Sequence, residues 1–313
     1  MSYGKCNILL AYLACQLCGC AVQVDEGTVN LSCAIEQVTF EPHDTYQFQG
    51  VSQDGRWLSV AWSKRDESES RGAYLLELET MKKTKLPQRF NNTGSFSPNG
   101  RWLVGAHYIT ENNTDIFIYD RDGKRSKSIS PHGSYDFLPS FSPDNETILF
   151  NAFRSGNSEL VLVDWSTGNI KQVTDNDVYD AHGEFSPDGH KILFHRMVRQ
   201  RPSGGYDFDL YSIDLNDHHE IRLTQSPFEE SYGSWAPDNQ TIVFSSDFKQ
   251  SPEQSNLYIR TPSGRLLRLT QGDWKDSYSY WTRDGRYIYF NSDRAGVTNI
   301  VRLPMQGLVC KTA

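Results

Sequence analysis

The residues with the clearest chemical potential are carboxylates that recur at one position of a repeated sequence. Four acidic residues and one asparagine each stand five residues before an aromatic residue that opens a turn: Asp136, Asp180, Glu230, Asp276 and Asn91. If the fold brings these side chains together, the carboxylates focus a negative potential on the space between them. The spacing therefore predicts a binding site for a protein or peptide segment that is basic or amphipathic.

Aromatic residues accompany these carboxylates. Two residues further along the repeats stand His182, Tyr232 and Tyr278, and in other repeats Leu138 and Phe48. Aromatic surface beside acidic groups is typical of a site that recognises an amphipathic segment. We therefore predict that these rings belong to the same site.

The chain has none of the sequence motifs that mark common catalytic sites. The G-x-S-x-G nucleophile elbow, the H-E-x-x-H zinc motif, the G-x-G-x-x-G fingerprint and the P-loop are all missing from the sequence. We therefore expect a binding protein with no catalytic residue and no cofactor.

Composition agrees with a folded protein that does not bind nucleic acid. The 313 residues are 37% hydrophobic and 12% aromatic, which is enough for a large core. The net charge is −8 and no run of basic residues occurs, whereas phosphate binding needs clustered lysine and arginine. We expect a monomer.

The elements that must position these residues come from an internal repeat. Six units lie 44 to 50 residues apart, among them "FSPNGRWLVGAH" from Phe96, "FSPDGHKILFHR" from Phe185 and "WTRDGRYIYFNS" from Trp281. Each unit alternates apolar and polar residues between glycine-bearing turns, a pattern typical of β-strands. A unit of this length accommodates four strands, the size of one propeller blade.

The repeats resemble those of the TolB-type propellers. The segments "SFSPDNETILFNAFRSGNSELVLVD" from Ser140 and "YWTRDGRYIYFNSDRAGVTNIVRLP" from Tyr280 are similar to the family consensus, and the resemblance covers Ile35 to about Gly307. It implies an all-β fold, a six-bladed β-propeller of four-stranded antiparallel blades over residues 35–313. TolB has an additional α/β domain before its propeller, whereas here we expect only a short peptide between Cys20 and the first strand, so the role of that domain is not carried over.

The family geometry implies where the carboxylates lie. The strand before each "SPDG" turn is innermost in TolB-type propellers, so the acidic and aromatic positions would surround one mouth of the central channel. In the structural alternative, each carboxylate bonds the backbone or a neighbouring arginine, with Arg154 and Arg294 as candidates. A purely structural protein would have a channel plugged by its own side chains.

An enzyme remains the second alternative. Oligogalacturonate lyases are propellers that hold a divalent metal with histidine and glutamine. His43, His132 and His182 all fall in segments entering innermost strands and are the candidate metal ligands.

The first residues resemble the signal peptide of a bacterial lipoprotein. A charged start and an apolar run precede "LCGC", which resembles a lipobox with lipid on Cys20. We expect a signal peptide over 1–19, a tether over 20–34, and an outer-membrane lipoprotein of the cell envelope that faces the periplasm. Without lipidation the protein would be secreted.

Either end of the mature chain could supply the outer strand that closes the ring. "EQVT" from Glu36 is in phase with the outermost strands of the repeats, so we predict that Ile35 to Thr39 pairs with Thr298 to Pro304. The rival for that position is the tail over 308–313. In both arrangements Cys33 and Cys310 lie near each other, which predicts a disulfide.

Overall fold

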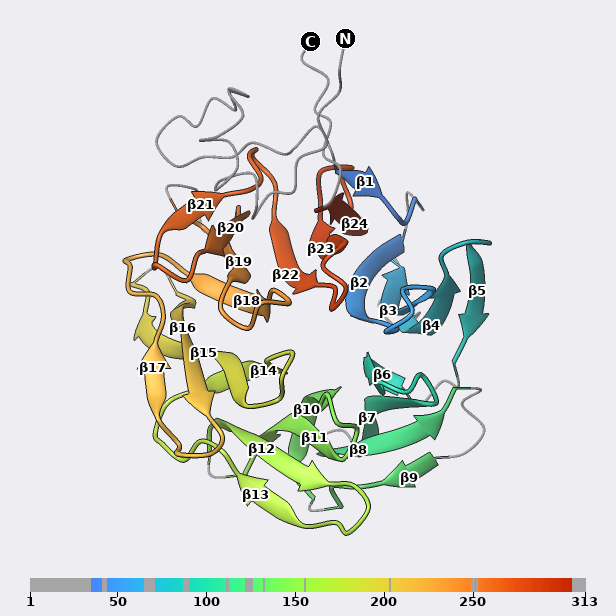
Figure 1. The fold of residues 1–313 in the computed structure, drawn as a ribbon. Coiled ribbons are helices and arrows are strands. Elements are labelled where there is room, and N and C mark those ends of the chain that lie inside the picture. The colour runs from blue at the N-terminus through green and yellow to red at the C-terminus, as the bar shows by residue number, and fades with distance from the viewer. Residues whose placement is uncertain are drawn as a thin grey trace.

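The protein is built from short strands arranged around a central axis. The computed structural model describes residues 35–40, 44–64, 71–86, 90–110, 113–121, 126–131, 133–154, 156–202, 204–248, 251 and 253–305. Within these ranges every regular element is a strand, and no helix is long and apolar enough to cross a membrane. Figure 1 shows the strands grouped into blades around the ring.

The blades follow one another along the chain. The strands of the first three are β2 (Asp44–Val51), β3 (Trp57–Lys64), β4 (Arg71–Glu77) and β5 (Lys82–Lys85); β6 (Phe90–Phe96), β7 (Trp102–Thr110), β8 (Asn113–Asp120) and β9 (Ser126–Ser128); and β10 (Tyr135–Phe141), β11 (Thr147–Phe153), β12 (Ser158–Asp164) and β13 (Ile170–Gln172). The others are β14 (Asp180–Phe185), β15 (Lys191–Gln200), β16 (Tyr206–Asp214) and β17 (Glu220–Arg222); β18 (Glu230–Trp235), β19 (Ile242–Ser246), β20 (Asn256–Arg260) and β21 (Leu266–Arg268); and β22 (Asp276–Trp281), β23 (Tyr287–Ser292) and β24 (Asn299–Pro304) with β1 (Glu36–Gln37).

Each blade is an antiparallel sheet of four strands in chain order from the axis outward, apart from the last, which ends in β1. One parallel residue pair, Tyr135 with Thr114, joins β10 to β8 and makes a single sheet of those two blades. The predicted all-β propeller of four-stranded antiparallel blades is confirmed.

The core lies between the blades. Leu149 and Leu160 of one blade pack with Phe185 and Ile192 of the next, all fully or nearly fully buried. Inner strands such as β11 are buried on both faces because a sheet covers each side. Outermost strands such as β13 are exposed throughout.

The N-terminal strand closes the ring. Glu36 and Gln37 pair with Arg302 and Val301, and Val38 donates its N–H to the carbonyl of Ile300 at 2.9 Å. The predicted pairing of this segment with the last blade is confirmed, and it leaves β24 with partners on both sides. The tail over 308–313, Cys33 and Cys310 lie outside the described residues.

Candidate functional site

The innermost strands β2, β6, β10, β14, β18 and β22 surround the channel (Figure 1). We call the end where these strands begin the entry face, and the end where they finish the turn face. Every innermost strand ends in a tight turn with an Asp or Asn. In the β10 blade, Asp144 accepts hydrogen bonds from the Ser142 hydroxyl and from the N–H of Glu146. The turns hold the ends of the innermost strands in place.

At the entry face, the four predicted carboxylates are buried. Asp136, Asp180 and Asp276 are fully inaccessible, and Glu230 is 2% exposed. The prediction that they form an exposed acidic ring is therefore wrong. Asn91 lies at the equivalent place in β6, but its side chain is outside the described part of the chain.

Three of these carboxylates form ion pairs with arginines of their own blades. Arg154 lies 3.2 Å from Asp136, Arg196 lies 2.7 Å from Asp180, and Arg294 lies 2.8 Å from Asp276. The structural alternative predicted two of these arginines. Arg196 was missed, although it stands directly opposite Asp180 in the next strand. Pairing is the physical reason for the missing ring, because a buried carboxylate needs a compensating charge.

Glu230 has no arginine partner among the described residues. In the last blade, Asp276 lies opposite Ser292, and its partner Arg294 follows two residues later. Glu230 lies opposite Ser246, and the residue two positions later is Phe248, which has no charge. One oxygen of Glu230 and one of Asp209 are buried without a hydrogen-bond partner. Burial raises the pKa of Glu230 to about 7, and the Asp209 carboxylate adds to the effect, against hydrogen bonds from Thr224 and Ser226. When Glu230 is protonated, its hydroxyl can donate a hydrogen bond to Asp209, so both unpaired oxygens gain a partner.

Inside the channel, three predicted rings meet. Tyr232 and Tyr278 stack with centroids 4.0 Å apart, and His182 lies 4.6 Å from the first and 5.3 Å from the second. They come from three successive innermost strands, so their contact narrows the channel.

A backbone irregularity directs these rings inward. Each of the strands β10, β14, β18 and β22 has a bulge, and there Leu138, His182, Tyr232 and Tyr278 have φ between 52° and 54°. This left-handed conformation is costly for bulky side chains and is retained where the surroundings enforce it.

The histidines give no metal centre within the described ranges. No group of three or more His, Cys, Asp or Glu side chains could hold an ion there. His182 instead contacts His195, with centroids 4.8 Å apart, and burial lowers the pKa of His182 to about 3. His43 and His132 lie outside the described residues.

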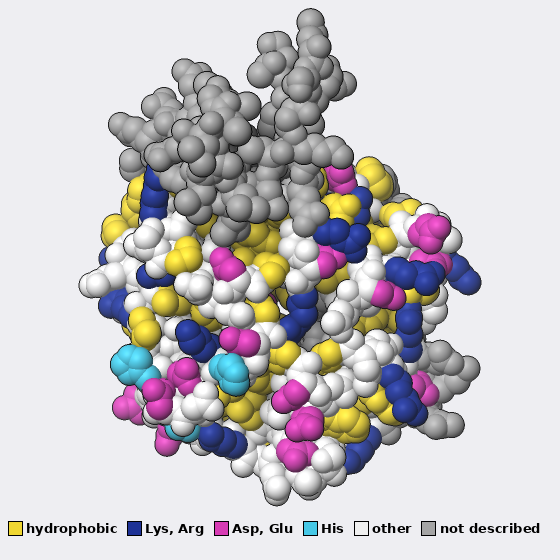
Figure 2. All heavy atoms as spheres, in the orientation of Figure 1, with side chains coloured by type: hydrophobic (Ala, Val, Ile, Leu, Met, Phe, Trp, Pro, Cys, Tyr) yellow, Lys and Arg dark blue, Asp and Glu magenta, His cyan; other side chains and the backbone are white. Residues whose placement is uncertain are grey.

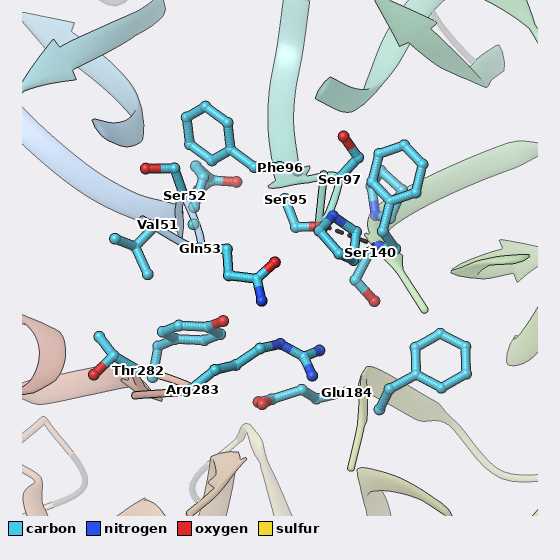
Figure 3. A pocket seen from close by; sticks show the side chains of 18 of the residues that line it. Val51, Ser52, Gln53, Ser95, Phe96, Ser97, Ser140, Glu184, Thr282 and Arg283 are labelled. Carbon is cyan, nitrogen blue, oxygen red and sulfur yellow. Dashed lines mark hydrogen bonds between the residues drawn. The ribbon is translucent and has the colours of Figure 1, made fainter. Parts of the chain in front are cut away.

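The turn face opens into a cavity of about 180 Å³. Its walls are the ends of the innermost strands and the turns after them, and its polar side chains include Gln53, Ser140, Glu184 and Arg283. Figure 3 shows Gln53 and Arg283 reaching across the cavity and Glu184 beside them. In Figure 2 the centre of the ring is hollowed, and atoms of basic side chains lie in the hollow.

Two of the charged residues that line the cavity, Glu184 and Arg283, differ in their charge at neutral pH. Burial raises the pKa of Glu184 to about 8, although Ser234 donates a hydrogen bond to it at 3.0 Å and Arg283 opposes the shift. Glu184 is therefore mainly neutral at pH 7. Arg283 donates to the carbonyl of Pro187 at 3.3 Å and forms no ion pair with any described residue.

Sequence reasoning missed these cavity residues, although both depart from the repeat. Glu184 stands where Ser95, Ser140 and Ser234 stand in other units, and Arg283 occupies a turn position that holds proline in most units. A search for departures from the repeat would have found them.

The comparisons identify the family. Residues 49–252 match the model of the TolB beta propeller domain, PD40, which covers more than half of the chain. The chain belongs to the TolB β-propeller family.

Solved structures agree with this fold. TolB from Acinetobacter baumannii superposes with a TM-score of 0.62 at 22% identity, over 76% of this chain and 57% of that one. A putative TolB from Agrobacterium tumefaciens gives 0.63 at 16% identity, over 86% and 97% of the two chains. An oligogalacturonate lyase from Vibrio parahaemolyticus gives 0.57 at 13% identity, over 86% and 93%. At these identities the likeness shows the fold alone, and the chain spans little more than half of the A. baumannii protein.

Proposed function

We propose that this protein is a binding module that holds an amphipathic segment of a protein partner on its entry face. The observation that carries the proposal is a row of exposed apolar side chains across two blades. Phe153 is 44% exposed, Tyr108 is 39% exposed and Tyr135 is 36% exposed. A protein partner is consistent with membership of the TolB β-propeller family.

The strand registers place these exposed side chains near one another. Tyr135 lies opposite Phe153 in one blade and beside Thr114 of the neighbouring blade, and Thr114 lies opposite Tyr108. Ile109, next in the chain, is 49% exposed. Exposed apolar side chains gathered in one region of a surface mark an interaction site.

The charges around the row favour an apolar contact over a basic one. Asp136 lies directly behind Tyr135, but it is buried and paired with Arg154, whose side chain is 30% exposed. Asp136 therefore offers little free negative charge to a basic segment beside the row. We therefore propose an amphipathic partner segment that binds through its apolar side, and we do not propose that the segment is basic.

The test compares captured partners between variants. The double variant Tyr135→Ser, Phe153→Ser removes the centre of the row, and Ile221→Ser, a 47% exposed residue on the outermost strand β17, is the matched control. Each partner captured from envelope extract by the wild-type protein is purified and titrated against all three. We expect at least tenfold weaker binding by the double variant, since aromatic residues dominate interface energies. Equal affinity for every partner would show that the row is not the contact surface.

We also propose export to the cell envelope with lipid on Cys20. The support is the sequence of residues 1–20, which lie outside the described residues. The mass of the mature protein tests both parts: a diacylated N-terminal cysteine supports the proposal, and an unmodified N-terminus contradicts lipidation.

A further inference from the structure

The cavity at the turn face is not used by the proposed protein-binding surface, which lies at the other end of the channel. We propose that this cavity binds a carboxylate group through the guanidinium of Arg283, with the Ser140 hydroxyl and the Gln53 amide as hydrogen-bond donors. The ligand is a small carboxylic acid or the C-terminal carboxylate of a peptide chain.

The first argument is the balance of charge in the cavity. Asp284 also lines it, but this carboxylate accepts from the Thr282 hydroxyl and the N–H of Arg286, and it pairs with the Arg286 guanidinium. Arg283 has no such partner among the described residues. The cavity therefore holds one cation whose charge is not balanced by an ion pair.

The second argument is a hydroxyl without a partner. The Oγ of Ser140 is buried and makes no hydrogen bond to any described group. Its equivalents in other blades do: Ser95 accepts from the N–H of Phe141 at 2.9 Å, and Ser234 accepts from the N–H of Trp281 at 2.9 Å. Buried polar atoms are nearly always paired, so the free hydroxyl of Ser140 points to a bound group. Figure 3 shows Ser140 at the cavity wall across from Arg283.

The protonation state of Glu184 favours an anionic ligand at neutral pH. Because burial raises the pKa of Glu184 to about 8, the group is mainly protonated at pH 7 and does not repel a carboxylate. The titratable and charged groups that influence Glu184 are Arg283 and, through its hydroxyl, Tyr280, while Ser234 donates to it. At higher pH, ionised Glu184 competes with the ligand for the field of Arg283.

The choice of carboxylate follows from the number of cations and the size of the site. A planar guanidinium pairs with a planar carboxylate through two parallel hydrogen bonds. A phosphate dianion carries more charge than the one unbalanced cation compensates. A cavity of about 180 Å³ accommodates a small acid or one terminal residue, not a folded segment.

The experiment titrates the full protein with defined probes at pH 7 and measures binding by calorimetry and ligand-observed NMR. The probes are propionate, the dipeptide N-acetyl-Ala-Ala with a free carboxylate, its C-terminal amide, and inorganic phosphate. We expect saturable binding of at least one carboxylate and none of the amide or phosphate. Binding of propionate identifies a small acid as a sufficient ligand, and binding of the dipeptide alone identifies a peptide terminus.

Substitutions test whether Arg283 and Ser140 bind the carboxylate. Arg283→Gln should weaken binding roughly tenfold to a hundredfold, because a hydrogen bond to a charged group is lost. Arg101→Gln removes an exposed arginine that follows an equivalent turn and does not itself line the cavity, and it should leave the affinity unchanged. Ser140→Ala, which removes one atom, should weaken binding a few-fold. Thermal melts of each variant show whether the fold is retained.

The pH dependence gives a second readout. Wild-type affinity should fall between pH 7 and pH 9, and Glu184→Gln should abolish this fall because glutamine cannot ionise. The proposal is overturned if no carboxylate binds, if amide or phosphate binds as well as the acid, or if Arg283→Gln and Arg101→Gln bind alike. Loss of protein capture by the entry-face variant would not change any of these results, so the two proposals fail separately.

Discussion

The two ends of the channel differ in whether their inward charged side chains form ion pairs. At the entry face three carboxylates are buried, and each is paired with an arginine of its own blade. At the turn face Arg283 lines a cavity without an ion pair in the described structure, beside a Glu184 that is mainly neutral. The paired carboxylates of the entry face therefore contribute little free charge, whereas Arg283 at the turn face is a cation without an ion pair among the described residues.

The difference shows that counting charged residues along a repeat does not predict the potential of a site. A charge contributes to recognition only where the fold leaves it without a close counterion. Glu230, on the same face, shows this as well: it has no arginine partner among the described residues, and burial raises its pKa to about 7. The predictions below test this distinction between paired and unpaired groups.

The largest effect is expected from breaking a buried pair. Asp276→Ala leaves Arg294, whose side chain is 18% exposed, without its carboxylate, and should lower the free energy of unfolding by about 3 to 5 kcal/mol. Glu230→Gln at pH 6 is the matched control, since it removes no ion pair, and should change stability by less than about 1 kcal/mol. Urea unfolding measures both. Equal losses would mean that pairing does not distinguish the two positions.

A smaller effect is expected from the proton on Glu230. The folded-state pKa is raised from 4.5 to about 7, so the folded protein binds more protons than the unfolded chain in this interval. The contribution to stability is full below pH 4.5 and is lost as the pH rises to about 7, by roughly 1 to 3 kcal/mol. Glutamine cannot ionise, so Glu230→Gln should remove this loss. Unfolding curves from pH 4.5 to 8 give the difference, and parallel curves would contradict a bound proton.

The ring stack between the two faces should respond to acid in the opposite sense. The pKa of His182 is lowered from 6.5 to about 3, so the unfolded chain binds a proton that the folded protein does not. Stability should therefore fall below pH 6.5, by roughly 1 kcal/mol per pH unit. His182→Asn, which tolerates the left-handed backbone, should weaken this dependence, whereas the exposed turn residue His190, changed to Gln, should not. If both variants follow the wild-type curve, His182 is not the titrating group.

The smallest effect is expected in the turns. Asp144→Ala removes the acceptor for Ser142 and for the N–H of Glu146, with no ion pair involved. We expect a loss of about 1 kcal/mol in thermal unfolding. The neighbouring exposed residue, changed as Glu146→Ala, should have a smaller effect. A loss as large as that of Asp276→Ala would mean that the turn face depends on its carboxylates as strongly as the entry face.

Much of the fold could be predicted from the sequence because it repeats. Turn residues and alternating apolar residues in each unit specify the strands, and the phase of "EQVT" identified the strand that pairs with β24. These are local patterns, and local patterns determine strand order and pairing well.

The site could be predicted only in part. Asp136 and Asp276 lie near the starts of innermost strands, and Arg154 and Arg294 were candidate partners, but the burial of the carboxylates depends on how these arginines fold back over the innermost strand. The left-handed backbone at Tyr232 has no signal in its residue type, since bulky side chains avoid it. Glu184 and Arg283 become neighbours only when the ring closes, because they lie in different blades.

Ring closure by β1 also has a kinetic consequence. Its partner strand lies some 260 residues later in the chain, so this contact has the largest sequence separation of the strand pairs in the described structure. Closing a long loop has an unfavourable entropy, and this cost precedes any stabilising contact between the two segments. Contacts between distant segments therefore form late in folding. During synthesis the first blades can fold while β1 waits for β24. A nascent chain therefore leaves β1 unpaired until the last blade is complete, and in this interval the strand can pair with a second chain.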